Sequence, residues 1–313
     1  MQLSERIGRR LKLHDLHVFM AVVDAGGMGS ASRRLNTTQP AISRSIAELE
    51  ETFGVRLLDR NRRGVEPTKF GRSLLECATA VFDDLRRGVK NIEFLNDPTV
   101  GEVRIGGNEA QIVGVIAAVV SRLRQRYPRI ANHITPIDAL AQQYSDLRER
   151  KVDLILARIP QSVDNDIEAD VLFYDRTYVV AGSHSKWARR RKIELPELAD
   201  EPWCLPPASS LPGTIFGEAF RAAGLNFQLN GVTTGSPQLH LNLLATGPFL
   251  AILPGSMLRF PRNMQGLKIL PVKLSIPPWP VGFMNLKGRA LSPVAQLFIA
   301  STREVVKPFA RKK

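Results

Sequence analysis

Polar side chains that can hydrogen-bond to nucleic-acid bases gather around residue 40 of this 313-residue chain. Gln39, Ser43 and Arg44 follow one another within a short segment, and Pro40 stands beside them. A glutamine can pair with adenine through two hydrogen bonds, an arginine can do so with guanine, and a serine suits either kind of base edge. Such a set is typical of a helix that reads DNA, although the solvated face of an ordinary amphipathic helix has the same composition.

The apolar residues of the same segment indicate how these side chains are positioned. Ile42, Ile46 and Leu49 recur at the helical spacing of three or four residues and form one stripe, so the polar residues face the other way. Pro40 suits the first turn of a helix, and Thr38 suits the position just before it, where a hydroxyl can cap free backbone N–H groups. The segment therefore predicts a helix with a buried apolar side and an exposed polar N-terminal side.

Shorter helical segments come before this helix. Residues 13–25 carry apolar side chains at helical spacing and end at a pair of glycines, and residues 30–35 form a second, short helix. A polar turn separates the short helix from the longer one. This order predicts a helix-turn-helix, whose last helix enters the major groove of DNA.

Basic residues flank the predicted helix-turn-helix on both sides. Arg33 and Arg34 lie on the short helix, where a backbone phosphate of bound DNA would lie. Residues 57–71 place further basic side chains around a glycine and a proline, which is typical of a hairpin loop, or wing, that grips phosphate. The basic residues of this loop are Arg60, Arg62, Arg63 and Lys69. A solvated run of charges is the alternative interpretation of the same loop.

A long helix is predicted after the loop. Its apolar residues recur at spacings of three, four or seven and form a narrow seam, which is typical of a helix that pairs with a second copy. The seam consists of Leu74, Ala78, Val81, Leu85, Ile92 and Leu95. Pairing would present two recognition helices to the two halves of a pseudo-palindromic site.

The chain from residue 99 onward alternates short apolar strands with amphipathic helices. This alternation predicts parallel sheets with helices on their faces, arranged in two similar lobes. In such sheets ligands bind beyond the carboxyl ends of the strands, so we expect a small-molecule cleft where those ends meet. The residues at these ends are Asn108, Glu109, Ile137, Arg158, Ser209, Thr234, Gly235 and Ser236.

The charged members of this set indicate the kind of ligand. Arg158 can hold a carboxylate through two hydrogen bonds, and Ser236 would sit at the N-terminus of a helix, where anions are stabilised. Glu109 would repel a carboxylate unless it pairs with Arg158 or meets hydroxyl groups of the ligand. The expected effector is therefore an organic acid or a sugar-like polyol. Taken singly, each of these residues is equally consistent with an ordinary turn or cap.

Composition and motifs disfavour other classes of function. The formal net charge of +13 suits a polyanionic partner, and the sequence shows no secretion signal, so we expect a cytoplasmic protein. No nucleophile elbow, phosphate-binding loop or metalloprotease motif is present, which predicts no catalytic residue, no metal and no cofactor. Cys77 and Cys204 are expected to be buried, reduced thiols. A cytosolic small-molecule-binding protein or enzyme that uses the helix-turn-helix for another interaction is the remaining alternative.

The N-terminal motifs resemble those of a known family. The stretches FMAVVDAGG, ASRRLNTTQPAISRSIAELEETFGVRLLDR, RRG and PTKFG fill most of residues 13–72 and are similar to the DNA-binding domain of LysR-type transcriptional regulators. The sequence of residues 64–71, GVEPTKFG, looks like that of regulators of sugar and aromatic-acid catabolism. Residues 28–30 and Pro67 depart from the usual pattern of the family, and neither departure touches the expected base-reading residues.

The resemblance implies a fold that is α/β overall. A winged helix-turn-helix, all-α apart from its small wing, leads into a long dimerisation helix and then into a two-lobed α/β effector domain like that of periplasmic binding proteins. The expected limits are 1–70 for DNA binding, 71–98 for the dimerisation helix and hinge, and 99–313 for the effector domain. Within the effector domain, lobe 1 is expected at 99–172 and 275–313, and lobe 2 at 173–274.

The resemblance also implies a function. It is sequence-specific transcription regulation by a homodimer or homotetramer, controlled by an effector between the lobes, with RNA polymerase as a further partner. The family's base contacts fall here on Gln39, Pro40, Ser43 and Arg44, and its wing arginine falls on Arg63.

Overall fold

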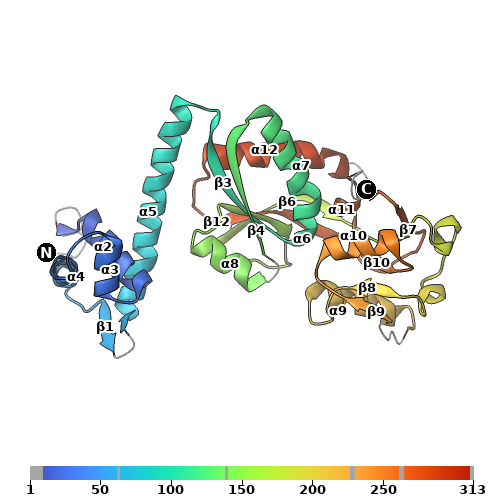
Figure 1. The fold of residues 1–313 in the computed structure, drawn as a ribbon, viewed down its shortest axis with the longest axis horizontal. Coiled ribbons are helices and arrows are strands. Elements are labelled where there is room, and N and C mark those ends of the chain that lie inside the picture. Colours follow the sequence, from blue (N-terminus) through green and yellow to red (C-terminus); the bar gives the residue numbers. More distant parts are fainter. Residues whose placement is uncertain (1–9, 62–63, 138–139, 226–229, 261–263, 311–313) are drawn as a thin grey trace. The chain divides into compact units, whose positions relative to one another are not determined.

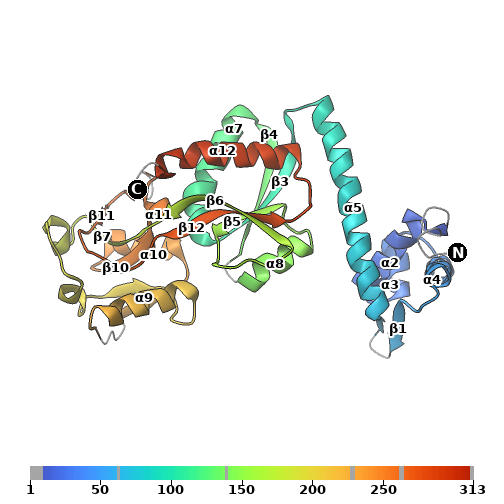
Figure 2. The same ribbon diagram turned by 180° about the vertical axis from the view of Figure 1, so that it is seen from behind.

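The computed structural model describes residues 10–61, 64–137, 140–225, 230–260 and 264–310. Within it the chain forms two compact units, residues 1–90 and residues 91–313 (Figures 1 and 2). The first unit is helical with a small hairpin, and the second is built on two five-stranded sheets. Each unit has hydrophobic cores of its own, as a separately folding domain requires.

Three helices open the first unit: α2 (Leu13–Ala25), α3 (Met28–Arg34) and α4 (Gln39–Phe53). Gly26 ends α2 in the left-handed conformation, with a φ of 66°, which residues with a side chain rarely adopt. α4 begins at the predicted cap, because the hydroxyl of Thr38 accepts a hydrogen bond from the N–H of the third residue of α4 at 3.4 Å. The sequence therefore predicts both the helix order and the start of α4 correctly.

The core of this unit contains the apolar stripe of α4. Ile42, Ile46 and Leu49 are each at most 3% exposed, and they share one cluster with Phe19 of α2 and Ala31 of α3. Full burial of each of these aliphatic side chains contributes roughly 1.5–3 kcal/mol to the free energy of unfolding. The stripe therefore fixes which side of α4 faces solvent.

An antiparallel hairpin of β1 (Leu58–Asn61) and β2 (Gly64–Pro67) follows α4. Glu50 of α4 holds the chain just before the hairpin, because its carboxylate accepts a hydrogen bond from the N–H of Leu57 at 2.7 Å. The hairpin lies where the sequence predicts a wing, and this hydrogen bond ties it to the candidate recognition helix.

The long helix α5 (Lys69–Asn96) follows the hairpin. Thr68 caps it, since its hydroxyl accepts a hydrogen bond from the N–H of Gly71 at 3.1 Å. The first turns of α5 pack into the core of the first unit through Leu74 and Ala78. Its later turns expose aliphatic side chains to solvent.

The first sheet of the second unit has the strand order β4-β3-β5-β12-β6. β3 pairs in parallel with β4 and β5, whereas β12 is antiparallel to β5 and β6. The strands are β3 (Val100–Gly107), β4 (Arg129–Pro136), β5 (Leu154–Arg158), β6 (Ile167–Asp175) and β12 (Trp279–Leu286). The parallel pairing brings the carboxyl ends of β3, β4 and β5 to the same edge of the sheet.

The second sheet has the strand order β11-β7-β10-β8-β9. β8 is parallel to β9 and β10, and β7 is antiparallel to β10 and β11. The strands are β7 (Thr177–Gly182), β8 (Trp203–Leu205), β9 (Gly231–Thr233), β10 (Leu250–Pro254) and β11 (Leu267–Ile269). The chain crosses between the sheets where β6 leads into β7 and returns between β11 and β12 (Figure 1).

Helices cover both faces of each sheet. Buried side chains of α7 and α12 pack on one face of the first sheet and those of α8 on the other, while α9 and α10 pack on opposite faces of the second sheet. The helices are α6 (Glu109–Gln111), the π-helical turn η1 (Ile112–Ile116), α7 (Ala117–Arg126), α8 (Leu140–Arg148), α9 (Leu211–Ala222), α10 (Pro237–Thr246), α11 (Gly255–Leu258) and α12 (Pro293–Ala310), with 3₁₀ turns at η2 (Lys186–Arg189) and η3 (Leu195–Leu198). The predicted two-lobed α/β fold is confirmed, but both sheets are mixed and not wholly parallel as the alternation predicts, because β12 and β7 run antiparallel to their neighbours. The elements β6, β11 and α11 are ones that the sequence did not indicate.

His240 of α10 is a buried titratable group of the second sheet. It is 5% exposed, and its Nε2 has no hydrogen-bond partner among the described residues. Burial lowers the pKa of His240 to about 4. Since the unfolded chain takes up a proton at this imidazole near pH 6.5 and the folded chain does not, the free energy of unfolding should fall as the pH drops from 6.5 towards 4.

The expected loss from this histidine is roughly 3 kcal/mol over that range, measured by urea unfolding at a series of pH values. The variant His240→Leu removes the titration, so its stability should depend less steeply on pH than that of the unaltered protein. Identical pH slopes for the two proteins would contradict the expectation. His184→Leu, at an exposed position, is the matched control and should leave the slope unaltered.

Candidate DNA-binding surface and ligand cleft

The solvent side of α4 carries the residues expected to read bases. Gln39, Pro40 and Arg44 are exposed, and Ser43 is half-buried at the edge of the core. Gln39 and Ser43 are four residues apart, as are Pro40 and Arg44, so the four side chains share one helix face. Arg44 makes no hydrogen bond or ion pair to any residue that the structure describes, which leaves its guanidinium available to a base edge.

The expected phosphate contacts of α3 are weakly held. The guanidinium of Arg33 hydrogen-bonds to the hydroxyl of Ser30 at 3.3 Å, and that of Arg34 pairs with the carboxylate of Asp24 at 3.5 Å. Both arginines are exposed, and exposed ion pairs contribute only about 0–1 kcal/mol. Either guanidinium can therefore exchange its present partner for a phosphate.

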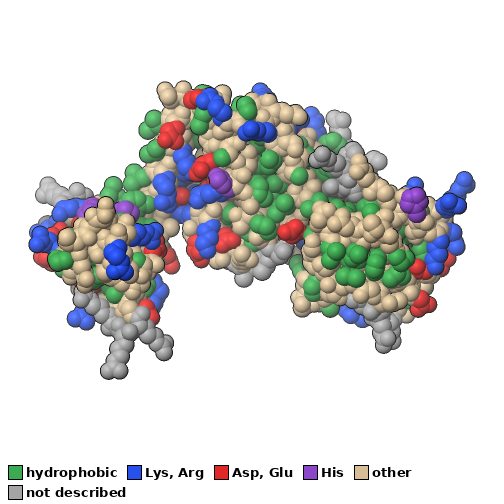
Figure 3. All heavy atoms as spheres, in the orientation of Figure 1, with side chains coloured by type: hydrophobic (Ala, Val, Ile, Leu, Met, Phe, Trp, Pro, Cys, Tyr) green, Lys and Arg blue, Asp and Glu red, His purple; other side chains and the backbone are tan. Residues whose placement is uncertain are grey.

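The hairpin region adds further basic residues. Arg60 lies on β1, while Arg62 and Arg63 lie outside the described residues. Lys69, at the start of α5, places its Nζ 4.9 Å from the centroid of the Phe70 ring. Lys and Arg side chains appear on the visible face of the first unit in Figure 3.

The apolar seam of α5 divides into a buried and an exposed part. Ala78 is fully buried in the core of the first unit and Leu74 packs against that core, which corrects their expected role in contacting a second copy. Val81 is half-buried. The seam pattern alone did not separate these positions, because a helix can use one stripe first inside its own domain and then outside it.

The exposed part forms a strip on the C-terminal half of the helix. Leu85, Val89, Ile92 and Leu95, here called the α5 strip, are 46%, 55%, 68% and 80% exposed. Their spacing of three or four residues puts them on one helix face, and hydrophobic side chains stand out along this helix in Figure 3. Large aliphatic side chains that gather on an exposed face mark an interaction surface.

Cys77 is exposed, contrary to the expected burial, whereas Cys204 is buried as expected.

In the second unit, the strand ends of the first sheet bring three candidate ligand residues together. Gly107, near the end of β3, pairs with Leu156 on β5. Asn108 and Glu109 follow β3, and Arg158 ends β5, so these residues lie at the same edge of adjacent parallel strands. This is the place where open α/β sheets bind ligands.

Asn108 and Glu109 begin the short helix α6, which continues directly into the π-helical turn η1. The side-chain oxygen of Asn108 accepts a hydrogen bond from the N–H of Gln111 at 3.2 Å and so caps the helix. Glu109 is half-buried and has no side-chain partner among the described residues. π-helical turns are rare and are frequent at functional sites.

Arg158 stands out among the charged groups of this edge. Its Nη1 atom is buried without a hydrogen-bond partner in the described part of the chain, and its guanidinium lies 3.1 Å from the centroid of the Trp279 ring. Burial lowers the pKa of Arg158 to about 10. No carboxylate of the described residues pairs with it, so the pairing with Glu109 is not formed. A partly desolvated guanidinium without an acidic partner is costly in a structural role, whereas it suits an anionic ligand.

The second sheet contributes turns and caps at its own strand ends. Thr234 and Gly235 follow β9, and the hydroxyl of Ser236 caps α10 by accepting a hydrogen bond from the N–H of Leu239 at 3.4 Å. The hydroxyl of Thr234 accepts a hydrogen bond from the N–H of Ser236 at 3.1 Å. Ser209, after β8, is exposed and makes no side-chain hydrogen bond to a described residue. The hydroxyls of Thr234 and Ser236 therefore stabilise the local turn and the start of α10. The hydroxyl of Ser209 remains available to a ligand.

Ile137 is a wrong prediction. Its side chain is fully buried and belongs to the core cluster that contains Tyr144 and Leu147 of α8. The residue stands at a strand end, as the sequence indicates, but its apolar side chain turns into the core beneath the sheet. Asp138, its neighbour, lies outside the described residues.

Trp279 is a candidate residue that the strand-end argument did not include. It begins β12, whose Val281 pairs with Arg158 in antiparallel register, so the indole lies beside the end of β5. The signal in the sequence was a tryptophan between prolines at the start of the closing strand. Its pairing with an arginine far away in the chain could not be deduced from that pattern.

The residues that the structure describes form neither a metal site nor a membrane span. No group of three or more His, Cys, Asp or Glu side chains in the described ranges is placed to hold a metal ion. Among the same residues, none of the helices combines the length and the hydropathy needed to cross a bilayer.

Two family models match the chain. Residues 13–72 match the model described as "Bacterial regulatory helix-turn-helix protein, lysR family", and residues 96–307 match the "LysR substrate binding domain". Among curated proteins, the transcriptional regulator GbpR of Azospirillum brasilense is 27% identical over 298 residues, which span 94% of this chain and 86% of GbpR. The regulator TdcA of Escherichia coli K12 is 24% identical over 268 residues, or 85% of this chain and 84% of TdcA.

Solved structures share the fold. A full-length OxyR variant from Pseudomonas aeruginosa is 18% identical with a TM-score of 0.67, covering 97% of this chain and 99% of that one. Full-length CbnR complexed with its target DNA is 21% identical with a TM-score of 0.60, covering 94% of this chain and 100% of that one.

Proposed function

Because the chain belongs to the LysR family of DNA-binding transcriptional regulators and is not an enzyme, we propose that it reads a pseudo-palindromic DNA site through α4. The observation that carries this proposal is the two-sided character of α4. Its apolar stripe is buried in the core, and its opposite face offers short polar side chains and Arg44, which has no partner among the described residues, to solvent. A helix of this kind fits the major groove with its N-terminal end leading.

The proposed contacts divide into base readers and phosphate contacts. The base readers are Gln39, Pro40, Ser43 and Arg44, and the phosphate contacts are Arg33, Arg34, Thr38, Arg60 and Arg63. Base contacts set the sequence preference, while phosphate contacts set the strength and salt dependence of binding. The proposed site of action is the cytoplasm, where chromosomal DNA and RNA polymerase are available to the protein.

We propose that the DNA-binding unit works as a pair. The domain limits proposed are 1–70 for DNA binding, 71–98 for the dimerisation helix and hinge, and 99–313 for the effector domain with its lobes at 99–172 with 275–313 and at 173–274. The α5 strip supports pairing, because it leaves large aliphatic side chains uncovered in a single chain. A homodimer, or a homotetramer built from two such dimers, would present recognition helices to two half-sites.

The proposed effector is a small organic acid bound at the carboxyl ends of β3 and β5. Arg158 supports this choice over a neutral polyol, because its guanidinium is partly desolvated and lacks an acidic partner among the described residues. The carboxylate of the effector would take the bidentate pairing that Arg158 now lacks, and hydroxyl groups of the same ligand would face Glu109. Ligand binding would shift the population of lobe arrangements and thereby alter how the paired helices bend and space the DNA.

Arg44→Ala tests the base-reading role of α4. We expect binding to the cognate site to weaken by roughly 1–3 kcal/mol, with a relaxed preference at one base pair of each half-site, since a bidentate contact to guanine is lost. The measurement is titration of labelled cognate and scrambled DNA at fixed salt. Arg122→Ala removes an exposed arginine of α7 in the second unit and should leave both affinities unchanged.

The contrast between cognate and scrambled DNA decides the outcome. Arg63→Ala should weaken binding to both DNAs alike and lower the salt slope, because it would remove a phosphate contact. If the unaltered protein bound both DNAs equally, sequence-specific reading through α4 would be wrong.

A further inference from the structure

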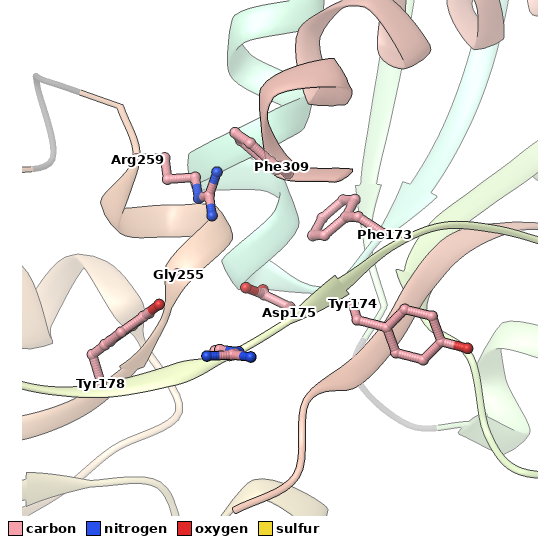
Figure 4. A pocket seen from close by; sticks show the side chains of 8 residues that line it. Phe173, Tyr174, Asp175, Tyr178, Gly255, Arg259 and Phe309 are labelled. Atoms are coloured by element: carbon pink, nitrogen blue, oxygen red, sulfur yellow. The ribbon is translucent and has the colours of Figure 1, made fainter. Parts of the chain in front are cut away.

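A hollow lies in the effector domain, away from the strand ends where the effector cleft is proposed. Its volume is about 230 Å³, enough for a small organic molecule, and it opens where β6 leads into β7 (Figure 4). Side chains from this crossing, from the region of α11 and from the end of α12 line it. None of the residues proposed for the effector cleft is among them.

The walls of this hollow combine aromatic rings with two guanidinium groups. Phe173 and Phe309 meet edge to face, with ring centroids 5.2 Å apart, and form an apolar side. Arg259 lies over the ring of Phe309 at 4.6 Å from its centroid and donates a hydrogen bond to the carbonyl of Pro308 at 3.1 Å. Figure 4 shows Phe173, Phe309 and Arg259 on the same side of the crossing strand. Arg176 is exposed and makes no side-chain hydrogen bond or ion pair with a described residue.

One carboxylate lies among these groups. Asp175 is 9% exposed, and its Oδ1 accepts a hydrogen bond from the N–H of Ser256 at 2.9 Å, so the carboxyl group is already directed towards α11. With two arginines and one aspartate, the lining carries an excess of one positive charge. An anionic group with an apolar body matches this mixture of walls better than a cation or a neutral polyol.

The same aspartate begins a buried polar connection to the proposed effector cleft. Ser256 is 1% exposed, and its hydroxyl accepts a hydrogen bond from the side-chain amide of Gln111 at 3.0 Å. Gln111 ends α6, the short helix that starts at the cleft residue Glu109. Packing at this point is tight, since a Cβ on Gly114 would lie only 2.7 Å from the carbonyl oxygen of Ser256. A shift of α11 must therefore displace α6 and η1, which pack against it.

We propose that the hollow at the β6–β7 crossing binds a second small carboxylate with an apolar body, and that Asp175, Ser256 and Gln111 couple its occupancy to the effector cleft. Arg176 and Arg259 hold the carboxylate of this ligand, and Phe173 and Phe309 hold its body. The inference goes beyond the proposed function and does not depend on DNA binding. The two sites together would let the protein respond to two metabolites.

The binding test uses 4-fluorophenylacetate as the probe and the full chain as the receptor, with ¹⁹F line broadening as the readout. Arg176→Ala should weaken binding by roughly tenfold or more, because a charge-assisted hydrogen bond to the probe is lost. Arg221→Ala, an exposed arginine of α9, is the matched control and should bind the probe normally. Arg158→Ala should also retain binding, since that residue belongs to the other site.

Several outcomes would overturn the site. Equal binding of the neutral 4-fluorophenylacetamide would show that the arginines do not recognise a carboxylate in this hollow. Loss of probe binding in Arg158→Ala would place the probe in the effector cleft. Displacement by inorganic phosphate at equal concentration would show that any small anion suffices and that the aromatic wall does not contribute. Phe309→Ala gives a second check, because it should weaken probe binding without removing either arginine.

The coupling is tested by hydrogen exchange of residues 109–116 with and without saturating probe. Probe binding should change the exchange rates of these amides by roughly fivefold or more in the unaltered protein. Ser256→Ala removes the hydroxyl that meets both Gln111 and the carboxylate of Asp175 but keeps the N–H that Asp175 also accepts from, so the probe should still bind while the exchange response disappears. Ser162→Ala, an exposed serine, should preserve the response. A full response in Ser256→Ala would refute the proposed connection.

Discussion

Leu85→Asp should convert the protein to a monomer and weaken its binding to a two-half-site operator by roughly 100-fold or more. The substitution places a carboxylate in the α5 strip, where a second copy would otherwise cover aliphatic side chains. Burying an unpaired charge in such an interface costs far more than the contact itself provides, so pairing should be lost. Each recognition helix would then bind its half-site alone and lose the gain from simultaneous binding.

Molar mass by light scattering and DNA titration measure the two parts of this expectation. Asn165→Asp adds the same charge at an exposed position between β5 and β6, outside α5, so it should leave the mass unchanged. An unchanged mass for Leu85→Asp would show that the strip does not form the dimer contact. Reduced DNA binding without a change in mass would point to damage in the DNA-binding unit instead.

Arg158→Ala should strongly weaken the response to effector while preserving DNA binding without effector. We expect the effector concentration for half-maximal response to rise by on the order of 100-fold, because a bidentate pair in a partly desolvated setting is lost. Arg158→Lys keeps the charge but not the planar fork, so its response should be intermediate. The readout is the footprint on the operator with a panel of small acids and sugars.

Trp279 gives an independent signal for the same site. Because its ring lies against the guanidinium of Arg158, a carboxylate that binds Arg158 should alter the tryptophan fluorescence, and Trp279→Phe should remove that change. An effector without a carboxylate, or a normal response in Arg158→Ala, would contradict the proposed acid. Hydroxyl contacts near Glu109 would then become the better explanation of specificity.

The DNA-binding half was the more predictable part of the chain because its signals are local. The cap at Thr38, the proline after it and the apolar stripe of α4 lie within a few turns of one helix, and they determine which side is exposed. The helix at Leu13–Ala25 has the limits that its periodicity and its glycine stop predict. Signals of this kind predict the structure well because the apolar stripe of α4 is the side that the core buries, as the local pattern indicates.

The ligand-binding half was predictable in its fold but less so in its site. Alternating strands and helices indicated the sheets, yet β6 was missed, since its alternation of buried and exposed residues includes several polar side chains. The direction of Ile137 and the contact between Arg158 and Trp279 depend on packing between segments far apart in the sequence. Ala78 shows the same limit, because a helical period cannot tell which layer of structure will cover a residue.

The uncovered strip on α5 has a consequence for how many molecules a cell must hold. If two chains must meet to cover it, the concentration of competent dimer depends on the square of the free-chain concentration at low abundance. A modest change in expression would then produce a larger change in operator occupancy, before any metabolite is involved. The helix would make gene dosage itself an input to the circuit that this protein controls.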